Sequence, residues 1–186
     1  AGTRALLDSY APIGLVCTPF IRITEQCPSA SYLRTRVNRE TVSSLSVQLL
    51  GKHADNLAYA AKVLSDEGVR VIDLNFGCPS RQVMSKGAGA AMLSQPEIVG
   101  DIVARVKNAV KGLVSAKIRG GIEQLDETLG VALAIEAAGA DFIVVHPRSS
   151  AQGYNGVADW RWVRAVKSAV AIPVVGNGDC WYARDA

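Results

Sequence analysis

The 186-residue sequence lacks several patterns by which common classes of protein are recognised. No apolar run approaches the roughly 20 residues that a membrane-spanning helix needs. The four cysteines, Cys17, Cys27, Cys78 and Cys180, form no CxxC pair, and neither histidine lies at zinc-finger spacing from them. A disulfide framework, a structural zinc site and a membrane partner are therefore not expected, and the reducing cytoplasm is the expected compartment.

The glycine-rich signatures of nucleotide-binding loops are also missing, because neither GxGxxG nor GxxxxGK followed by Ser or Thr occurs. One-sided charge is absent too. The 20 Lys and Arg residues against 17 Asp and Glu give a net charge of +3, which permits a polyanionic partner without requiring one. The chain is long enough for one domain with a sizeable core and too short for two ordinary ones, and we expect a monomer.

What the sequence does contain is an alternation of strand and helix patterns. Apolar, β-branched runs predict strands at 45–49, 69–74, 113–118, 142–146 and 172–176, with a weaker one at 15–18. Amphipathic or capped segments predict helices at 54–67, 95–110, 125–138 and 160–170. Repeated strand–helix units with apolar strands indicate a parallel sheet covered by helices.

Polar residues follow strand after strand, and this distribution decides between the two parallel-sheet architectures. They are Gln48, Asn75, Lys117, Arg119, His146, Arg148, Asn177 and Asp179. A (β/α)8 barrel places its active site at the carboxyl ends of all its strands, whereas a doubly wound sheet concentrates ligand groups at one switch point. We therefore predict a (β/α)8 barrel. A complete barrel needs about 250 residues, so 1–186 is expected to be an incomplete one of about six strands, lacking the first and last.

Cys78 is the first candidate for chemistry, because it follows a predicted strand and opens the longest loop in the chain. Gly77 permits a close backbone approach before it, and Pro79 fixes the turn after it. From composition alone, a cysteine packed as a small apolar residue is the competing interpretation. The polar strand ends around Cys78 favour a chemical role.

Lys117 is the second candidate, because a charged group in an otherwise apolar strand is costly unless something pairs with it. A lysine that only reaches for solvent is about as plausible from this feature alone. His146, Gln48 and Asn177 are each individually more typical of a core histidine or a turn cap. Together these residues suit a planar, anionic, hydrogen-bonding cofactor such as FMN, and no metal is expected.

Several segments, in this order and spacing, resemble the tRNA-dihydrouridine synthase family. They are VQLLG at 47–51, DLNFGCPS at 73–80, KGAGAAML at 86–93, AKIR at 116–119, VHPR at 145–148 with AQGY at 151–154, and GNGD at 176–179. The resemblance implies an FMN-binding (β/α)8 barrel, followed in whole members by a small helical domain that helps to grip tRNA and that lies outside 1–186. It also implies reduction of the C5=C6 bond of a uridine in tRNA, with NADPH as reductant.

The resemblance further implies a role for each matched residue. Cys78 would give a proton to C5, which is chemically reasonable because free thiols, with a pKa of about 8.5, are largely protonated at neutral pH. The remaining matched residues fall into groups that contact the cofactor, the uridine or the tRNA backbone. Cofactor contacts would come from Gln48, Lys117, His146, Asn177, Gly178 and Asp179; uridine contacts from Asn75 and Arg148; and backbone contacts from Lys86 and Arg81.

The sequence also departs from the family pattern. Ala11-Pro12-Ile13 is similar to the Ala-Pro-Met that closes the family's first strand, but 14–22 aligns better with its second strand. Two alternatives stay open. One is an FMN barrel that acts on a free pyrimidine, in the manner of a dihydroorotate dehydrogenase, and the other is a truncated barrel without activity.

Overall fold

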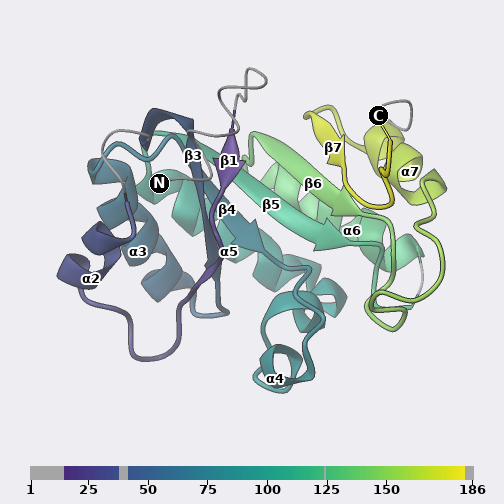
Figure 1. Ribbon diagram of the computed structural model, residues 1–186, viewed down its shortest axis with the longest axis horizontal. Coiled ribbons are helices and arrows are strands. Elements are labelled where there is room, and N and C mark those ends of the chain that lie inside the picture. Colours follow the sequence, from purple (N-terminus) through teal and green to yellow (C-terminus); the bar gives the residue numbers. More distant parts are fainter. Residues whose placement is uncertain (1–14, 38–41, 124, 183–186) are drawn as a thin grey trace.

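The computed structural model describes residues 15–37, 42–123 and 125–182 (Figure 1). The Ala11-Pro12-Ile13 segment lies outside them. The strands are β1 (Val16–Cys17), β2 (Ile21–Arg22), β3 (Leu45–Leu50), β4 (Val71–Asn75), β5 (Leu113–Arg119), β6 (Phe142–His146) and β7 (Val174–Gly176). The helices are α2 (Ala30–Thr35), α3 (Ala54–Asp66), α4 (Arg81–Met84), α5 (Pro96–Ala109), α6 (Leu125–Ala137) and α7 (Arg161–Ala169).

The strands form one parallel sheet in the order β1-β3-β4-β5-β6-β7. Strand β2 pairs with β3 further along the same edge as β1, so these two short strands are one interrupted strand beside β3. The sheet curls so that the described residues form part of a (β/α)8 barrel, as the sequence predicts (Figure 1). Six strand positions are occupied, in agreement with the expected number.

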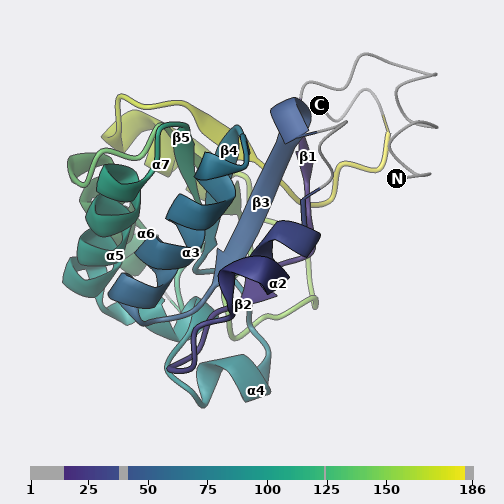
Figure 2. The ribbon, with the colours of Figure 1, turned by 90° about the vertical axis from the view of Figure 1, so that its left-hand side faces the viewer.

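The outer face of the sheet is apolar and carries the main core. Helices α3, α5 and α6 pack against one another in that order along this face, as Figure 2 shows. Alternate residues of each strand face them, among them Val47, Ile72 and Val114, all fully buried. Burying such a side chain contributes about 1.5–3 kcal/mol to stability. Because successive side chains of a strand point to opposite faces, burial of these residues against the helices directs their neighbours to the inner face of the sheet.

Helix boundaries follow from local chemistry. Leu57, Ala60 and Leu64 form the buried stripe of α3, and Gly68, at φ 91°, supplies the left-handed residue beyond its end. Helix α5 begins at Pro96, in the first turn, where a missing backbone N–H costs nothing. These helices hold the strand registers from outside.

The inner face of the sheet is polar, and its register brings the polar residues together. Gln48 is paired with Asp73 across β3 and β4, and Asn75 is paired with Lys117 across β4 and β5. Side chains on parallel strands at matched positions point to the same face. The inner face near the carboxyl ends is thus a continuous polar surface.

The structure adds short elements that the sequence pattern does not reveal. The long loop after Cys78 contains helix α4 and a 3-10 helix over Gly89–Ser94, and α2 precedes β3. Helix α4 lies beyond the carboxyl ends of the strands (Figure 1). Among the described residues, no helix has both the length and the apolar character to cross a membrane.

Candidate active site

A cavity of about 310 Å³ opens at the carboxyl ends of the strands. It is lined by Phe20, Gln48, Asn75, Gly77, Cys78, Pro79, Lys117, Arg119, His146, Tyr154 and Asn177. Six of these are predicted site residues, contributed by β3, β4, β5, β6 and the loops after β4 and β7. The structure therefore brings residues far apart in sequence to one place, as expected of a barrel site.

The backbone of Cys78 is held from both sides. Its N–H donates to Asn75 Oδ1 at 2.6 Å, and its carbonyl accepts from Ala90 N at 2.9 Å. Gly89 makes this closure possible: its φ is 61°, and a Cβ there would lie 2.6 Å from the Cys78 carbonyl oxygen. The small residues after Cys78 thus let the loop fold back onto the cysteine, which is a free thiol.

A chain of hydrogen bonds links that loop to the centre of the sheet. Asp73, buried, accepts from Ser115 Oγ and from Gln48 Nε2, both at 2.6 Å. Gln48 Oε1 in turn accepts from Asn75 Nδ2 at 2.7 Å. Because an amide has distinct donor and acceptor ends, the carboxylate of Asp73 sets the orientation of Gln48, and Gln48 sets that of Asn75. Asn75 Oδ1 is then available to the N–H of Cys78.

Lys117 and Asp73 place opposite charges on the inner face. Burial lowers the pKa of Lys117 to about 8, although the negative charge of Asp73 acts in the other direction. Burial likewise raises the pKa of Asp73, opposed by its hydrogen bonds from Gln48 and Ser115. No hydrogen bond or ion pair holds the Lys117 ammonium within the described residues. An anion in the cavity would supply the missing partner.

Arg119 braces two loops at the edge of the cavity. Its Nε donates to the Gly77 carbonyl at 2.7 Å, and its guanidinium also donates to the Gly153 carbonyl at 2.8 Å. The guanidinium lies over the Tyr154 ring, 5.4 Å from its centroid. The AQGY segment is therefore tied to the loop of Cys78 through one buried side chain.

His146 is oriented by the segment after β7. Its Nδ1 lies 2.7 Å from the Asn177 carbonyl oxygen and is therefore the protonated nitrogen. Burial lowers the pKa of His146, which favours the neutral ring. Its Nε2 is buried without a hydrogen-bond partner among the described residues. Gly178 packs on the ring so closely that a Cβ there would lie 2.7 Å from Nδ1.

Arg148 and Asp179 bind each other and do not line the cavity. The Arg148 guanidinium donates to both Asp179 oxygens at 2.9 Å and to the Gly156 carbonyl at 2.8 Å. Asp179, at φ 55°, also accepts from Ala158 N, and this bond together with Arg148 lowers its pKa. The predicted contacts of these two residues with uridine and cofactor stay predictions, and the pair visibly connects the loops after β6 and β7.

The two predicted backbone-binding residues are separated. Lys86 lines a second cavity, on the β2 and β3 side of the sheet, whereas Arg81 lines neither cavity. Among the described residues, no group of three His, Cys, Asp or Glu side chains could hold a metal ion.

Sequence reasoning missed Asp73, Phe20 and Tyr154 as individual site residues. Asp73 carried a usable signal, because an acid inside an apolar strand invites the same question as Lys117. Tyr154 belongs to the AQGY segment but is 80% exposed, at the rim. Phe20 falls in the break between β1 and β2, which no periodicity indicates.

The chain matches the family model described as "Dihydrouridine synthase (Dus)" over residues 2–186. It is 36% identical to the tRNA-dihydrouridine(16) synthase of Pseudomonas syringae pv. tomato, over 98% of this chain and 60% of that protein. It is 39% identical to the tRNA-dihydrouridine(16) synthase of Cupriavidus necator, over 89% of this chain and 54% of that protein. The chain thus spans somewhat more than half the length of these relatives.

Solved structures support the fold alone. A Burkholderia cenocepacia protein described as a "putative lyase/mutase" superposes with a TM-score of 0.55 at 14% identity, covering 98% of this chain and 76% of that one.

Proposed function

The chain belongs to the dihydrouridine synthase family, and from this premise we propose that the complete protein reduces the C5=C6 bond of a uridine in tRNA. FMN would be the bound cofactor and NADPH the reductant. The described residues would form part of an FMN-binding catalytic barrel, and a helical domain outside them would help to hold the tRNA.

One observation carries this proposal: a partly buried ammonium without an ionic partner faces the same cavity as the cysteine. Lys117 and Cys78 both line it, and the orphaned His146 Nε2 belongs to a third lining residue. A flat, anionic, hydrogen-bonding ring would satisfy the lysine and meet the amides of Gln48 and Asn177. The donor set therefore fits a flavin, and Asn177 and Gly178 would approach the side of its phosphate.

Bound flavin would supply the hydride that adds to C6 of the uracil. Cys78 would supply the proton: its S–H bond breaks as the new C–H bond forms at C5, so hydride and proton together saturate the double bond. The Asp73, Gln48 and Asn75 chain fixes the backbone from which the thiol projects. Lys117 would stabilise negative charge across the cavity.

The uridine must leave its stack to reach this cavity, and polar and aromatic contacts must offset that cost. Asn75 borders the cavity beside Cys78, and Phe20 and Tyr154 offer ring surfaces to a base. Arg148 would help to place the uridine through the loop after β6, which it holds by its bonds to Gly156 and Asp179.

The test uses the complete protein, purified without added cofactor. We expect a yellow protein that forms dihydrouridine in unmodified tRNA with NADPH and that leaves free uridine, uracil and orotate unreduced. A colourless protein, or one that reduces a free pyrimidine better than tRNA, would contradict the proposal. Relatives named for position 16 make that nucleotide the first to map.

A further inference from the structure

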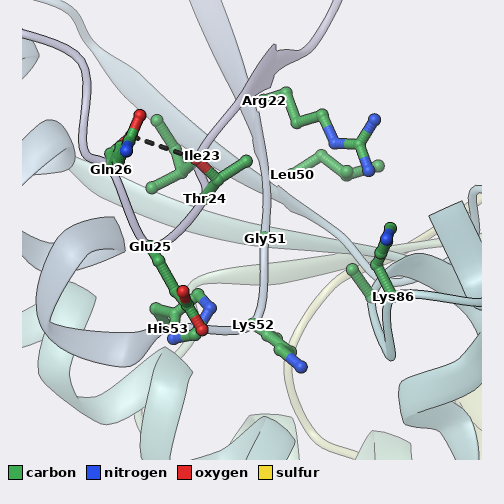
Figure 3. A pocket seen from close by; sticks show the side chains of 11 residues that line it. Arg22, Ile23, Thr24, Glu25, Gln26, Leu50, Gly51, Lys52, His53 and Lys86 are labelled. Atoms are coloured by element: carbon green, nitrogen blue, oxygen red, sulfur yellow. Dashed lines mark hydrogen bonds between the residues drawn. The ribbon is translucent and has the colours of Figure 1, made fainter.

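The second cavity, of about 430 Å³, has a basic lining that the reaction chemistry does not use. Arg22 from β2, Lys52 and His53 after β3, and Lys86 after α4 contribute to it, with Glu25 as the single carboxylate (Figure 3). Three permanent cations thus share one cavity with one acid. The lining contains no Phe, Tyr or Trp ring, which suits a ligand recognised by charge and not by stacking.

The positive charges of these three side chains are not neutralised by partners in the part of the chain that the structure describes. Among the described residues, neither Arg22, Lys52 nor Lys86 forms an ion pair or a side-chain hydrogen bond. Lys52 reaches across towards the loop of Lys86, and its Nζ lies 3.6 Å from where a Cβ would stand at Gly87. In Figure 3 the ends of Arg22 and Lys86 lie to the right and Glu25 to the left. Like charges that share a cavity repel one another, and an anion bound there would offset that repulsion.

The basic cavity adjoins the cysteine through one layer of side chains. Leu50, Val83 and Ala88 form a small buried cluster, and Cys78 packs against it. Leu50 and Ala88 also line the basic cavity. A ligand there is therefore next to the nucleotide whose base would reach Cys78, with this apolar wall between them.

We propose that the basic cavity binds a backbone phosphodiester of the tRNA beside the nucleotide that is reduced, through Lys52, Lys86 and Arg22. This assignment rests on the proposed function. Extruding a base distorts the flanking backbone, and a cationic pocket at that point holds the distorted strand. The negative charge of Glu25 would repel the phosphate and lower the affinity of the cavity for tRNA. Arg81, outside the cavity, has no part in it.

The experiment measures tRNA binding by the complete, flavin-loaded protein, by fluorescence anisotropy over a series of salt concentrations. At low salt, Lys52→Gln and Lys86→Gln should each weaken binding by roughly three- to tenfold. The triple variant with Arg22→Gln should reduce the slope of log K against log salt by about 0.7, the value for one lost phosphate contact on a single strand. Glu25→Gln should strengthen binding a few-fold.

Lys62→Gln is the matched control, because Lys62 is an exposed lysine on the outer helix α3, paired with Asp66. Lysine variants of the cavity that bind tRNA as this control does would overturn the proposal. So would a raised KM for NADPH in flavin reduction with unchanged tRNA binding, since the cavity would then hold a phosphate of the reductant. If the wild-type protein binds tRNA with the predicted variant pattern but forms no dihydrouridine, the proposed function fails and the phosphate site stands.

Discussion

Two cavities at the same end of the sheet differ in how they hold positive charge. Lys117, in the inner cavity, is partly buried among polar groups whose orientation is fixed by hydrogen bonds. Lys52 and Lys86, in the basic cavity, are exposed and make no ion pair among the described residues. One kind of side chain can therefore serve two purposes. A buried lysine discriminates between ligands strongly, whereas exposed lysines attract a polyanion weakly and additively.

The largest expected effect is that of removing the buried charge with Lys117→Met. Flavin binding by the complete protein should be lost or weakened by at least a hundredfold, measured by fluorescence titration of the apoprotein. The apoprotein itself should become more stable, because a pKa lowered from 10.5 to about 8 corresponds to a penalty of about 3 kcal/mol for the charged lysine. Apoprotein stability that falls in this variant would contradict the account of the inner cavity.

The sign of the pH dependence follows from the same pKa. Below pH 8 folded and unfolded Lys117 are both protonated and the full penalty applies, whereas between about pH 8 and 10.5 only the unfolded state keeps the proton. The stability advantage of Lys117→Met should therefore shrink as pH rises through this window. Flavin affinity of the wild type should be constant below pH 8 and fall above it, and the variant should lack this fall.

The second effect comes from Asp73→Asn, which removes the carboxylate that orients Gln48. An amide at 73 presents a donor as well as an acceptor, so Gln48 can bind it in either orientation and the chain of hydrogen bonds to Cys78 is no longer fixed. We expect tRNA reduction to slow by roughly 10- to 100-fold, with kcat affected more than KM.

The pH dependence of flavin affinity in Asp73→Asn separates a role in positioning and charge from a general structural defect. Without the negative charge of Asp73, the pKa of Lys117 falls further, and the pH above which flavin affinity declines should move down. Asp141→Asn is the matched control, because the Asp141 carboxylate also accepts two hydrogen bonds, from Lys107 Nζ and Val114 N, but lies on the outer side of the sheet. An equal shift in both variants would remove Asp73 from the positioning role.

The smallest expected effect is a difference between the two cavities in how strongly ligand binding depends on ionic strength. Exposed charges are screened within about 10 Å at 0.1 M salt, whereas buried ones are screened much less. The defect of Lys86→Gln in tRNA binding should therefore disappear at high salt, and the defect of Lys117→Met in flavin binding should persist. Arg81→Gln should show less effect than Lys86→Gln at any salt concentration, although the sequence places both residues in one loop.

The outer face of the sheet was predictable because period-2 strands and amphipathic helices record burial directly in residue type. The strands at 45–50 and 142–146 and the helix at 54–66 follow the expected ranges within a residue. Gathering Gln48, Asn75 and Lys117 at one end also followed from strand order. The contacts among these side chains could not be predicted. The hydrogen bonds that run through Asp73 depend on the register between β3 and β4, which no local pattern specifies.

The short elements were missed for a related reason. Helix α4 spans only Arg81–Met84, too short for a helical period to be visible in sequence, and its fold depends on the closure of Gly89 onto Cys78. In the folded loop Lys86 lines the basic cavity and Arg81 does not. Likewise, the mutual pairing of Arg148 with Asp179 arises from two loops 31 residues apart that only the barrel brings together.

The proton-donating role of Cys78 is tested most directly by the reoxidation of reduced flavin by tRNA in a single turnover, followed by absorbance in a stopped-flow instrument. In the complete protein, Cys78→Ala should bind flavin and be reduced by NADPH as the wild type is. Its reoxidation by tRNA should be at least a hundredfold slower, because hydride transfer to C6 then lacks the proton for C5. Equal rates of flavin reoxidation by tRNA in Cys78→Ala and wild type would contradict the account.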